Sequence, residues 1–316
     1  MADPTVTRGS TPAVTPDQAL AALPAGSPGA AGLPPAPVTP LGRRLRGDRF
    51  FQLGLVLVGI VVLAALCAPW LAPHDPYAGD LANDYLQPPG GRYLLGTDTQ
   101  GRDVLSRVLY GARISVTVGL ISQTVSVLLG VTLGLLAGYY GRWVDAIVMR
   151  LADITLAFPT LLLLIAVAAA VKPSLPVVFV VIGVVGWAAM ARLVRAQVLV
   201  LRRSEYVLAA QALGARDRWV IVRHLLPNVR AQVIIAATLG IAAAIMAEAA
   251  LSFVGLGAQP PTPSWGAMVA DGRDLLRVAP WVSFAPGIAI GVAVLGFNLV
   301  GDTLREVYDP RSRERT

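Results

Sequence analysis

Hydrophobic residues along this chain are gathered into long runs instead of alternating with polar residues. The first run, Phe50–Leu71, would be about 33 Å long as a helix, which is enough to cross a hydrocarbon layer of about 30 Å. Five further runs lie near residues 112–138, 145–170, 176–198, 230–256 and 281–301. Because each run has the length of a membrane-spanning helix, the pattern predicts an all-α membrane protein with six transmembrane helices.

Polar segments separate the runs and give the expected domain organisation. Both termini are expected in the cytoplasm, because only seven of the 26 Lys and Arg residues lie in the pieces that this orientation places outside. The expected parts are a disordered Pro/Ala-rich cytoplasmic tail (1–42), a first transmembrane helix with a basic flank (43–72), a periplasmic loop (73–111), a five-helix core (112–302) with a cytoplasmic loop at 202–228 and a periplasmic segment at 257–280, and a cytoplasmic tail (303–316).

Small residues predict where the helices pack closely. Gly130, Gly134 and Gly138 are spaced four apart and share one helical face, so a neighbouring backbone can approach them. The pair Gly287 and Gly291 indicates a second such contact, as does a ladder of Ala236, Gly240 and Ala244. Proline removes a helical hydrogen bond, so Phe158–Pro159 is expected to kink its span. Trp187, Trp265 and Trp281 are expected at the membrane interfaces.

The composition excludes several classes of function. The chain is 55% hydrophobic and only 14% charged, which is far from the composition of a soluble domain. Its single Cys67 excludes a thiolate metal site, and the distant His74 and His224 cannot form a zinc site without carboxylate ligands. Its one lysine, Lys172, has neither the preceding glycine nor the following hydroxyl of a phosphate-binding loop. With no catalytic motif and with arginines dispersed around apolar runs, neither an enzyme nor a nucleic-acid-binding protein is expected.

A few polar residues in or near the spans are candidates for function. Glu248 lies deep in its span, where a charge is costly without a partner. It either lines a pathway for cationic or zwitterionic substrate or ties its helix to a neighbouring helix or a partner subunit. Asn298 and Asp302 are one turn apart near the end of the last span and either cap helices or contribute to a gate. Asp153 is three residues after Arg150, which predicts an ion pair on one helix.

The cytoplasmic loop after the fourth span predicts a short exposed helix. Tyr206, Ala209, Ala210 and Leu213 form a shallow apolar stripe at helical spacing, and Gly214 is suited to end the helix in the left-handed conformation. Such a helix either docks into a groove of another protein or lies on lipid headgroups.

This loop resembles the EAA motif of ATP-binding cassette importer permeases, although three residues separate its glutamate from the alanine pair. Other segments, from Leu95–Arg107 to Asp309–Arg311, are similar to the second, DppC-like or OppC-like subunit of dipeptide, oligopeptide and nickel importers. The resemblance covers about residues 43 to 312. The residues that match the ATPase-coupling motif are Glu205, Ala209, Ala210, Gly214, Leu226 and Pro227.

The resemblance implies a type I importer permease fold, with a peripheral first helix and a five-helix core, in the bacterial cytoplasmic (inner) membrane. It also implies three kinds of partner: a paralogous DppB-like or OppB-like permease subunit, two cytoplasmic ATPase subunits that bind ATP and Mg, and an extracytoplasmic substrate-binding protein. No cofactor is expected in this chain. The implied cargo is a peptide or a related small solute such as a nickel chelate.

Two other classes of protein remain open at this point. A self-sufficient secondary transporter would use Glu248 for ion coupling, but it would be expected to carry further intramembrane carboxylates and an internal repeat. A membrane scaffold without transport activity would need no loop of the EAA type. Copurification with an ATPase separates both alternatives from the importer permease.

Overall fold

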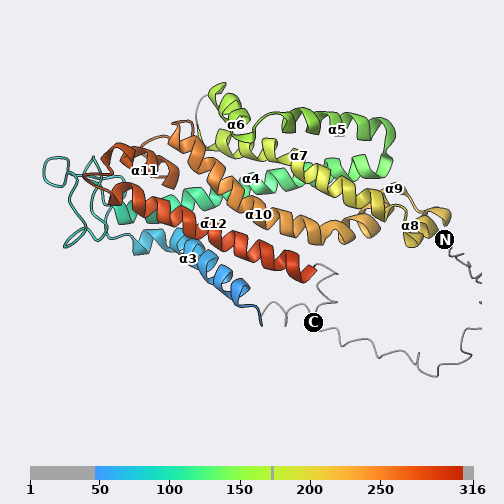
Figure 1. Cartoon of the computed structure of the whole chain (residues 1–316), viewed down its shortest axis with the longest axis horizontal. Helices are drawn as coiled ribbons and strands as arrows, with labels where there is room; N and C mark the ends of the chain where they lie inside the picture. Colours follow the sequence, from blue (N-terminus) through green and yellow to red (C-terminus); the bar gives the residue numbers. More distant parts are fainter. Residues whose placement is uncertain (1–46, 172–173, 309–316) are drawn as a thin grey trace, which may run out of the picture. The chain divides into compact units, whose positions relative to one another are not determined.

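The computed structural model describes residues 47–171 and 174–308, and every element in them is helical or loop (Figure 1). The expected tail at 1–42, Lys172 and the end of the C-terminal tail lie outside these residues. The all-α expectation is confirmed. The elements are α3 (Arg49–Leu71), α4 (Val104–Tyr140), α5 (Arg142–Ala157), α6 (Thr160–Ala169), α7 (Leu175–Leu201), α8 (Glu205–Ala212), α9 (Asp217–Val220), a π-helical turn (Ile221–Leu225), α10 (Leu226–Phe253), α11 (Trp265–Gly272), a 3₁₀ turn (Arg273–Leu275) and α12 (Trp281–Tyr308).

Five helices are long and apolar enough to cross a membrane, and a bent pair makes a sixth span if it is counted as one. The five are α3, α4, α7, the continuous helix Asp217–Phe253 and α12, while α5 and α6 form the pair, with a bend of 92° between them. The expected kink at Phe158–Pro159 is thus a complete break. Phe158 is extended, with φ −93° and ψ 142°, because the residue before proline is disfavoured in the α region.

Helix α4 begins earlier than the hydrophobic run indicated, at Val104 instead of near residue 112. Asp103 caps it, since its carboxylate accepts a hydrogen bond from the backbone N–H of Ser106 at 2.9 Å. The first turns of α4 therefore occupy part of the segment expected to be a loop. At the other end of the chain, α12 continues to Tyr308.

Glycines bring α4 and α7 into close contact, as their spacing predicted. A side chain at Gly134 would meet the carbonyl oxygen of Ala191 at 2.6 Å, and Gly130 and Gly138 lie similarly against α7. The packing prediction for Gly287 and Gly291 was wrong for this chain, because nothing lies within 4 Å of a side chain added at either position. That face of α12 is open in the chain.

The end of the bundle that carries the loop 72–103 and α11, here called the α11 end, is held by buried charges. Asp98 pairs with Arg102 at 2.7 Å and with Arg107 at 3.4 Å, and all three side chains are buried. Nearby, Tyr93 donates a hydrogen bond to Asp84 at 2.6 Å, which raises the pKa of Tyr93. These ion pairs fix the loop against α4. In the sequence, the segment that contains them was noted only as part of the family resemblance.

Three tryptophans contribute to the interior of the protein, Trp265 and Trp281 at this end and Trp187 in the middle of α7. Trp265 is 2% exposed and donates its indole N–H to the carbonyl of Val108 at 2.9 Å. Trp187 is also buried, and Trp281 donates to the carbonyl of Thr97 at 3.1 Å. The expectation that Trp187 and Trp265 anchor the chain at membrane interfaces was wrong, because hydropathy does not distinguish a lipid-facing indole from one bonded to a neighbouring helix.

Candidate functional site

Helix α8 lies at the opposite end of the bundle, here called the α8 end, and ends in a complete Schellman motif (Figure 1). The N–H of Ala215 bonds to the carbonyl of Ala210 at 3.1 Å, and the N–H of Gly214 bonds to that of Gln211 at 2.9 Å. Gly214 has φ +79°, the left-handed conformation that its position predicted, and open space surrounds the place of a side chain. Glycine is therefore favoured at this cap by the left-handed backbone conformation and not by a lack of space for a side chain.

A buried valine and a hydrogen bond from Gln211 to the Tyr139 hydroxyl of α4, at 3.3 Å, attach α8 to the bundle. Val207 is fully buried in a cluster with residues of α7 and α10, whereas Leu213 is 89% exposed. Glu205, Tyr206 and Ala209 are also exposed, and Ala210 is partly buried. The expected apolar stripe thus faces outward over most of its length. Sequence reasoning missed Val207, although a valine between exposed positions on a short helix is a signal for an anchor.

The segment after α8 extends the exposed surface with aromatic side chains. The ring of His224 lies 4.7 Å from that of Trp219 and 5.9 Å from that of Tyr206. Tyr139 at the end of α4 donates a hydrogen bond to Asp217 at 2.7 Å, which fixes α9 to the bundle. We call α8, Gly214 and the ring cluster Tyr206–Trp219–His224 the α8 surface.

Leu226 and Pro227 lie at the start of α10, directly after the π-helical turn. Proline has no N–H to donate, and the wider turn at Ile221–Leu225 leads the chain into α10 around it. Leu226 and Pro227 are both exposed. Leu226 and Pro227, which match the ATPase-coupling motif, therefore lie where a π-helical turn changes to an α-helix next to the α8 surface.

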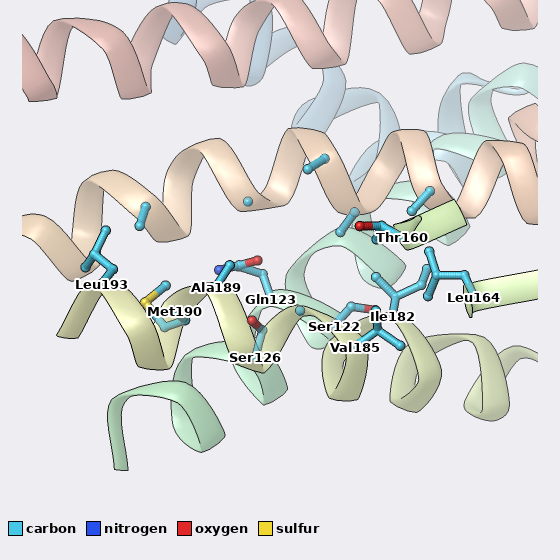
Figure 2. A pocket seen from close by; sticks show the side chains of 16 residues that line it. Ser122, Gln123, Ser126, Thr160, Leu164, Ile182, Val185, Ala189, Met190 and Leu193 are labelled. Carbon is cyan, nitrogen blue, oxygen red and sulfur yellow. The ribbon is translucent and has the colours of Figure 1, made fainter. Parts of the chain in front are cut away.

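A cavity of about 310 Å³ lies between α4, α6, α7 and α10. Figure 2 shows Gln123, Ser126 and Thr160 around the same space, with Leu164, Ile182 and Met190 forming apolar parts of the wall. None of the described residues that line the cavity carries a charge. Its volume is near the lower end of the range for ligand pockets, about 300 to 1,000 Å³.

Glu248 does not line this cavity and is fully buried beside it. Its carboxylate accepts hydrogen bonds from Ser252 at 2.7 Å and from Ser115 at 3.1 Å, and Ser252 in turn accepts one from Ser264 at 3.2 Å. Ser264 caps α11 by accepting from the N–H of Ala267. The carboxylate thereby connects α10 to α4 and, through the serines, to α11.

The other polar candidates lie apart from the cavity. Asn298 is partly buried and Asp302 is exposed on α12. Asp153 pairs with Arg192 of α7 at 2.5 Å, and its expected ion pair with Arg150 does not form. With the pair of Asp145 and Arg195, this contact joins α5 to α7.

Comparison with known proteins defines the class of this chain. Residues 130–314 match the family model described as binding-protein-dependent transport system inner membrane component, and residues 41–89 match the N-terminal TM domain of oligopeptide transport permease C. The chain belongs to this family and is a multi-pass inner-membrane permease subunit of an ATP-binding cassette importer. This membership confirms the resemblance to DppC-like and OppC-like subunits and does not support the secondary-transporter and scaffold alternatives.

Individual relatives are similar over nearly their whole lengths. The dipeptide transport system permease protein DppC of Alkalihalophilus pseudofirmus is 43% identical over 86% of this chain and 89% of its own. The oligopeptide transport system permease protein OppC of Bacillus subtilis is 38% identical over 86% of this chain and 88% of its own. The glutathione transport system permease protein GsiD of Pectobacterium atrosepticum is 41% identical over 81% of this chain and 85% of its own.

Proposed function

We propose that this chain forms half of a pathway for short peptides, together with a paralogous permease, and that separate ATPase subunits hydrolyse ATP and bind its Mg. The three relatives described above are named for dipeptides, oligopeptides and glutathione, which favours a peptide cargo over a nickel chelate. The predicted orientation places the α8 end in the cytoplasm and the α11 end outside, where a substrate-binding protein would deliver the cargo.

The α8 surface is the proposed contact with the ATPases. The observation that carries this proposal is an exposed, capped helix with apolar side chains that the rest of the described chain leaves uncovered. Glu205, Ala209 and Gly214 lie on this surface, and the small alanine allows close approach to a groove. Because Val207 and the bond from Tyr139 to Asp217 hold α8 and α9 to the bundle, a displacement of the ATPase would be passed to the membrane helices.

Glu248 is proposed as a positioning residue and not as a group that contacts cargo. Its carboxylate is enclosed by serines and lies outside the cavity wall, so a peptide in the cavity would not touch it. Its proposed role is to hold α11 against α10 and α4. Asn298 and Asp302 also lie outside the cavity wall, so neither is proposed to contact cargo.

The proposal is tested by purifying the tagged chain gently in detergent and identifying the bound proteins by mass spectrometry. Gly214→Asp is compared with Gly214→Asn, which has nearly the same size and tolerates the left-handed conformation but adds no charge. We expect the parent chain to retain a second permease and ATPase, and Gly214→Asp to lose the coupling of ATP hydrolysis to uptake more severely than Gly214→Asn. Normal coupling in Gly214→Asp, in a complex of normal abundance, would contradict the assignment of the α8 surface.

A further inference from the structure

A serine in the wall of the cavity between α4, α6, α7 and α10 has a hydroxyl group with no hydrogen-bond partner among the described residues. Ser122 is 1% exposed, and its Oγ atom is buried without a partner among the described residues. A buried polar group left unpaired costs about 1 to 3 kcal/mol, so such groups normally have a partner. Ser122 lines the cavity, but its hydroxyl is closed off from that space in this conformation, so a rotation of the side chain about χ1 would bring it to a molecule in the cavity.

The same wall offers further groups that bond to amides. Gln123 carries both an acceptor oxygen and two N–H donors, and it lies directly against Gly240 of α10, where only a glycine leaves space for it. Ser126 lies beside Gly186 of α7 in the same manner. Helices α10 and α7 thus have glycine at the positions that face these polar side chains of α4. The missing side chains leave room for polar groups within the membrane region.

The break between α5 and α6 reaches this cavity. Thr160 is the first residue of α6, follows Pro159 directly and lines the cavity wall. The last carbonyl groups of α5 and the first N–H groups of α6 have no partners within their own helices. In a membrane, backbone of this kind is tolerated only where it is buried in protein or lines a cavity with polar contents, and such breaks mark binding sites in other transporters.

We infer that this cavity binds the peptide cargo through its uncharged backbone amides, with Ser122 and Gln123 as the hydrogen-bonding groups. The inference rests on the proposed function. A wall without charges has nothing to bind the charged ends of a peptide, whereas hydroxyl, amide and backbone groups match a peptide bond. Leu164, Ile182 and the adaptable Met190 complete an apolar surface for cargo side chains of different shapes.

Deleting the unpaired hydroxyl separates cargo binding from folding. Ser122→Ala removes a buried group that has no partner in the described chain, so the fold should be as stable as before or more stable. The matched control is Thr124→Val on the same helix, because the Thr124 hydroxyl is already bonded to the carbonyl of Leu120 at 2.7 Å and does not line the cavity.

The assay uses the complete importer in proteoliposomes, with its binding protein saturated by tri-alanine and ATP supplied to the ATPases. We expect Ser122→Ala to lower the uptake rate about five- to tenfold, the effect of one hydrogen bond, while Thr124→Val transports at the parent rate. Gln123→Leu should reduce the preference of the importer for tri-alanine over its backbone N-methylated analogue by a similar factor. Uptake at the parent rate in Ser122→Ala overturns the inference.

Occupancy of the cavity is measured with a thiol probe in a Cys67→Ala background. Cargo should protect Ala243→Cys, which lies in the wall, from a thiol reagent during transport, and it should not protect Ala166→Cys, an exposed position on α6 outside the wall. A thiol at 243 that is inaccessible with or without peptide means that a lipid chain or the second permease fills the space, and this also overturns the inference. If the parent importer carries no peptide at all, the proposed function itself has failed.

Discussion

Leu213 allows the docking role of α8 to be tested apart from folding. Its side chain is 89% exposed, so the bundle gains almost nothing from it. If the ATPase buries this side chain, Leu213→Ala removes about three buried carbon atoms and about 2 kcal/mol of association free energy. That loss corresponds to a roughly 30-fold weaker affinity for the ATPase, since about 1.4 kcal/mol is a factor of ten.

The affinity is measured by titrating purified ATPase against the detergent-solubilised permease pair on a biosensor, with thermal unfolding recorded on the same samples. We expect the dissociation constant of Leu213→Ala to rise about 30-fold while its free energy of unfolding stays within about 0.5 kcal/mol of the parent value.

Two variants complete the comparison. Leu94→Ala removes a leucine that is 63% exposed at the α11 end, and it should leave ATPase affinity unchanged. Val207→Ala shortens the buried anchor of α8, so it should lower both thermal stability, by roughly 1 to 3 kcal/mol, and ATPase affinity. A dissociation constant for Leu213→Ala within twofold of the parent value would refute the docking role of this face.

Three further predictions concern the polar contacts. Glu248→Gln should keep peptide uptake, because an amide still bonds to the serines. Glu248→Leu should destabilise the fold by about 2 to 4 kcal/mol in thermal unfolding. Loss of uptake in a stable Glu248→Gln complex would instead indicate that the carboxylate takes a direct part in transport. Asp98→Ala removes the carboxylate that pairs with the buried cations of Arg102 and Arg107, and it should lower stability by about 3 to 5 kcal/mol, seen as reduced abundance in the membrane. Normal abundance would show that these cations do not depend on Asp98. Asp145→Ala should increase amide hydrogen exchange in α5 more than Asp153→Ala does, because the ion pair of Asp153 is more than half exposed. Equal exchange in the two variants would show that burial does not set the strength of these two ion pairs.

The sequence predicted what depends on runs and local spacing. Membrane helices follow from stretches of apolar residues, and the contact of α4 with α7 follows from glycines repeated every four residues. The left-handed cap at Gly214 was predictable because a helix end and a glycine are adjacent in the chain. These features need no knowledge of what lies across the bundle.

Contacts between distant segments were not predictable from one sequence. The partner of Asp153 is Arg192, on another helix, and not the nearby Arg150. The start of α4 is set by the side chain of Asp103, which caps the helix. Hydropathy alone assigns this polar segment to a loop. The cavity requires four helices at once, so nothing in the chain near Ser122 indicates that this residue lines a cavity.

The continuous helix from Asp217 to Phe253 joins the two ends of the bundle. Its 37 residues span about 55 Å at 1.5 Å per residue. One end is bonded through Asp217 to Tyr139, and near the other Glu248 is bonded to Ser115. Both partners belong to α4, so the two long helices are joined near each of their ends. A force applied at α9 would therefore be expected to move α10 and α4 together.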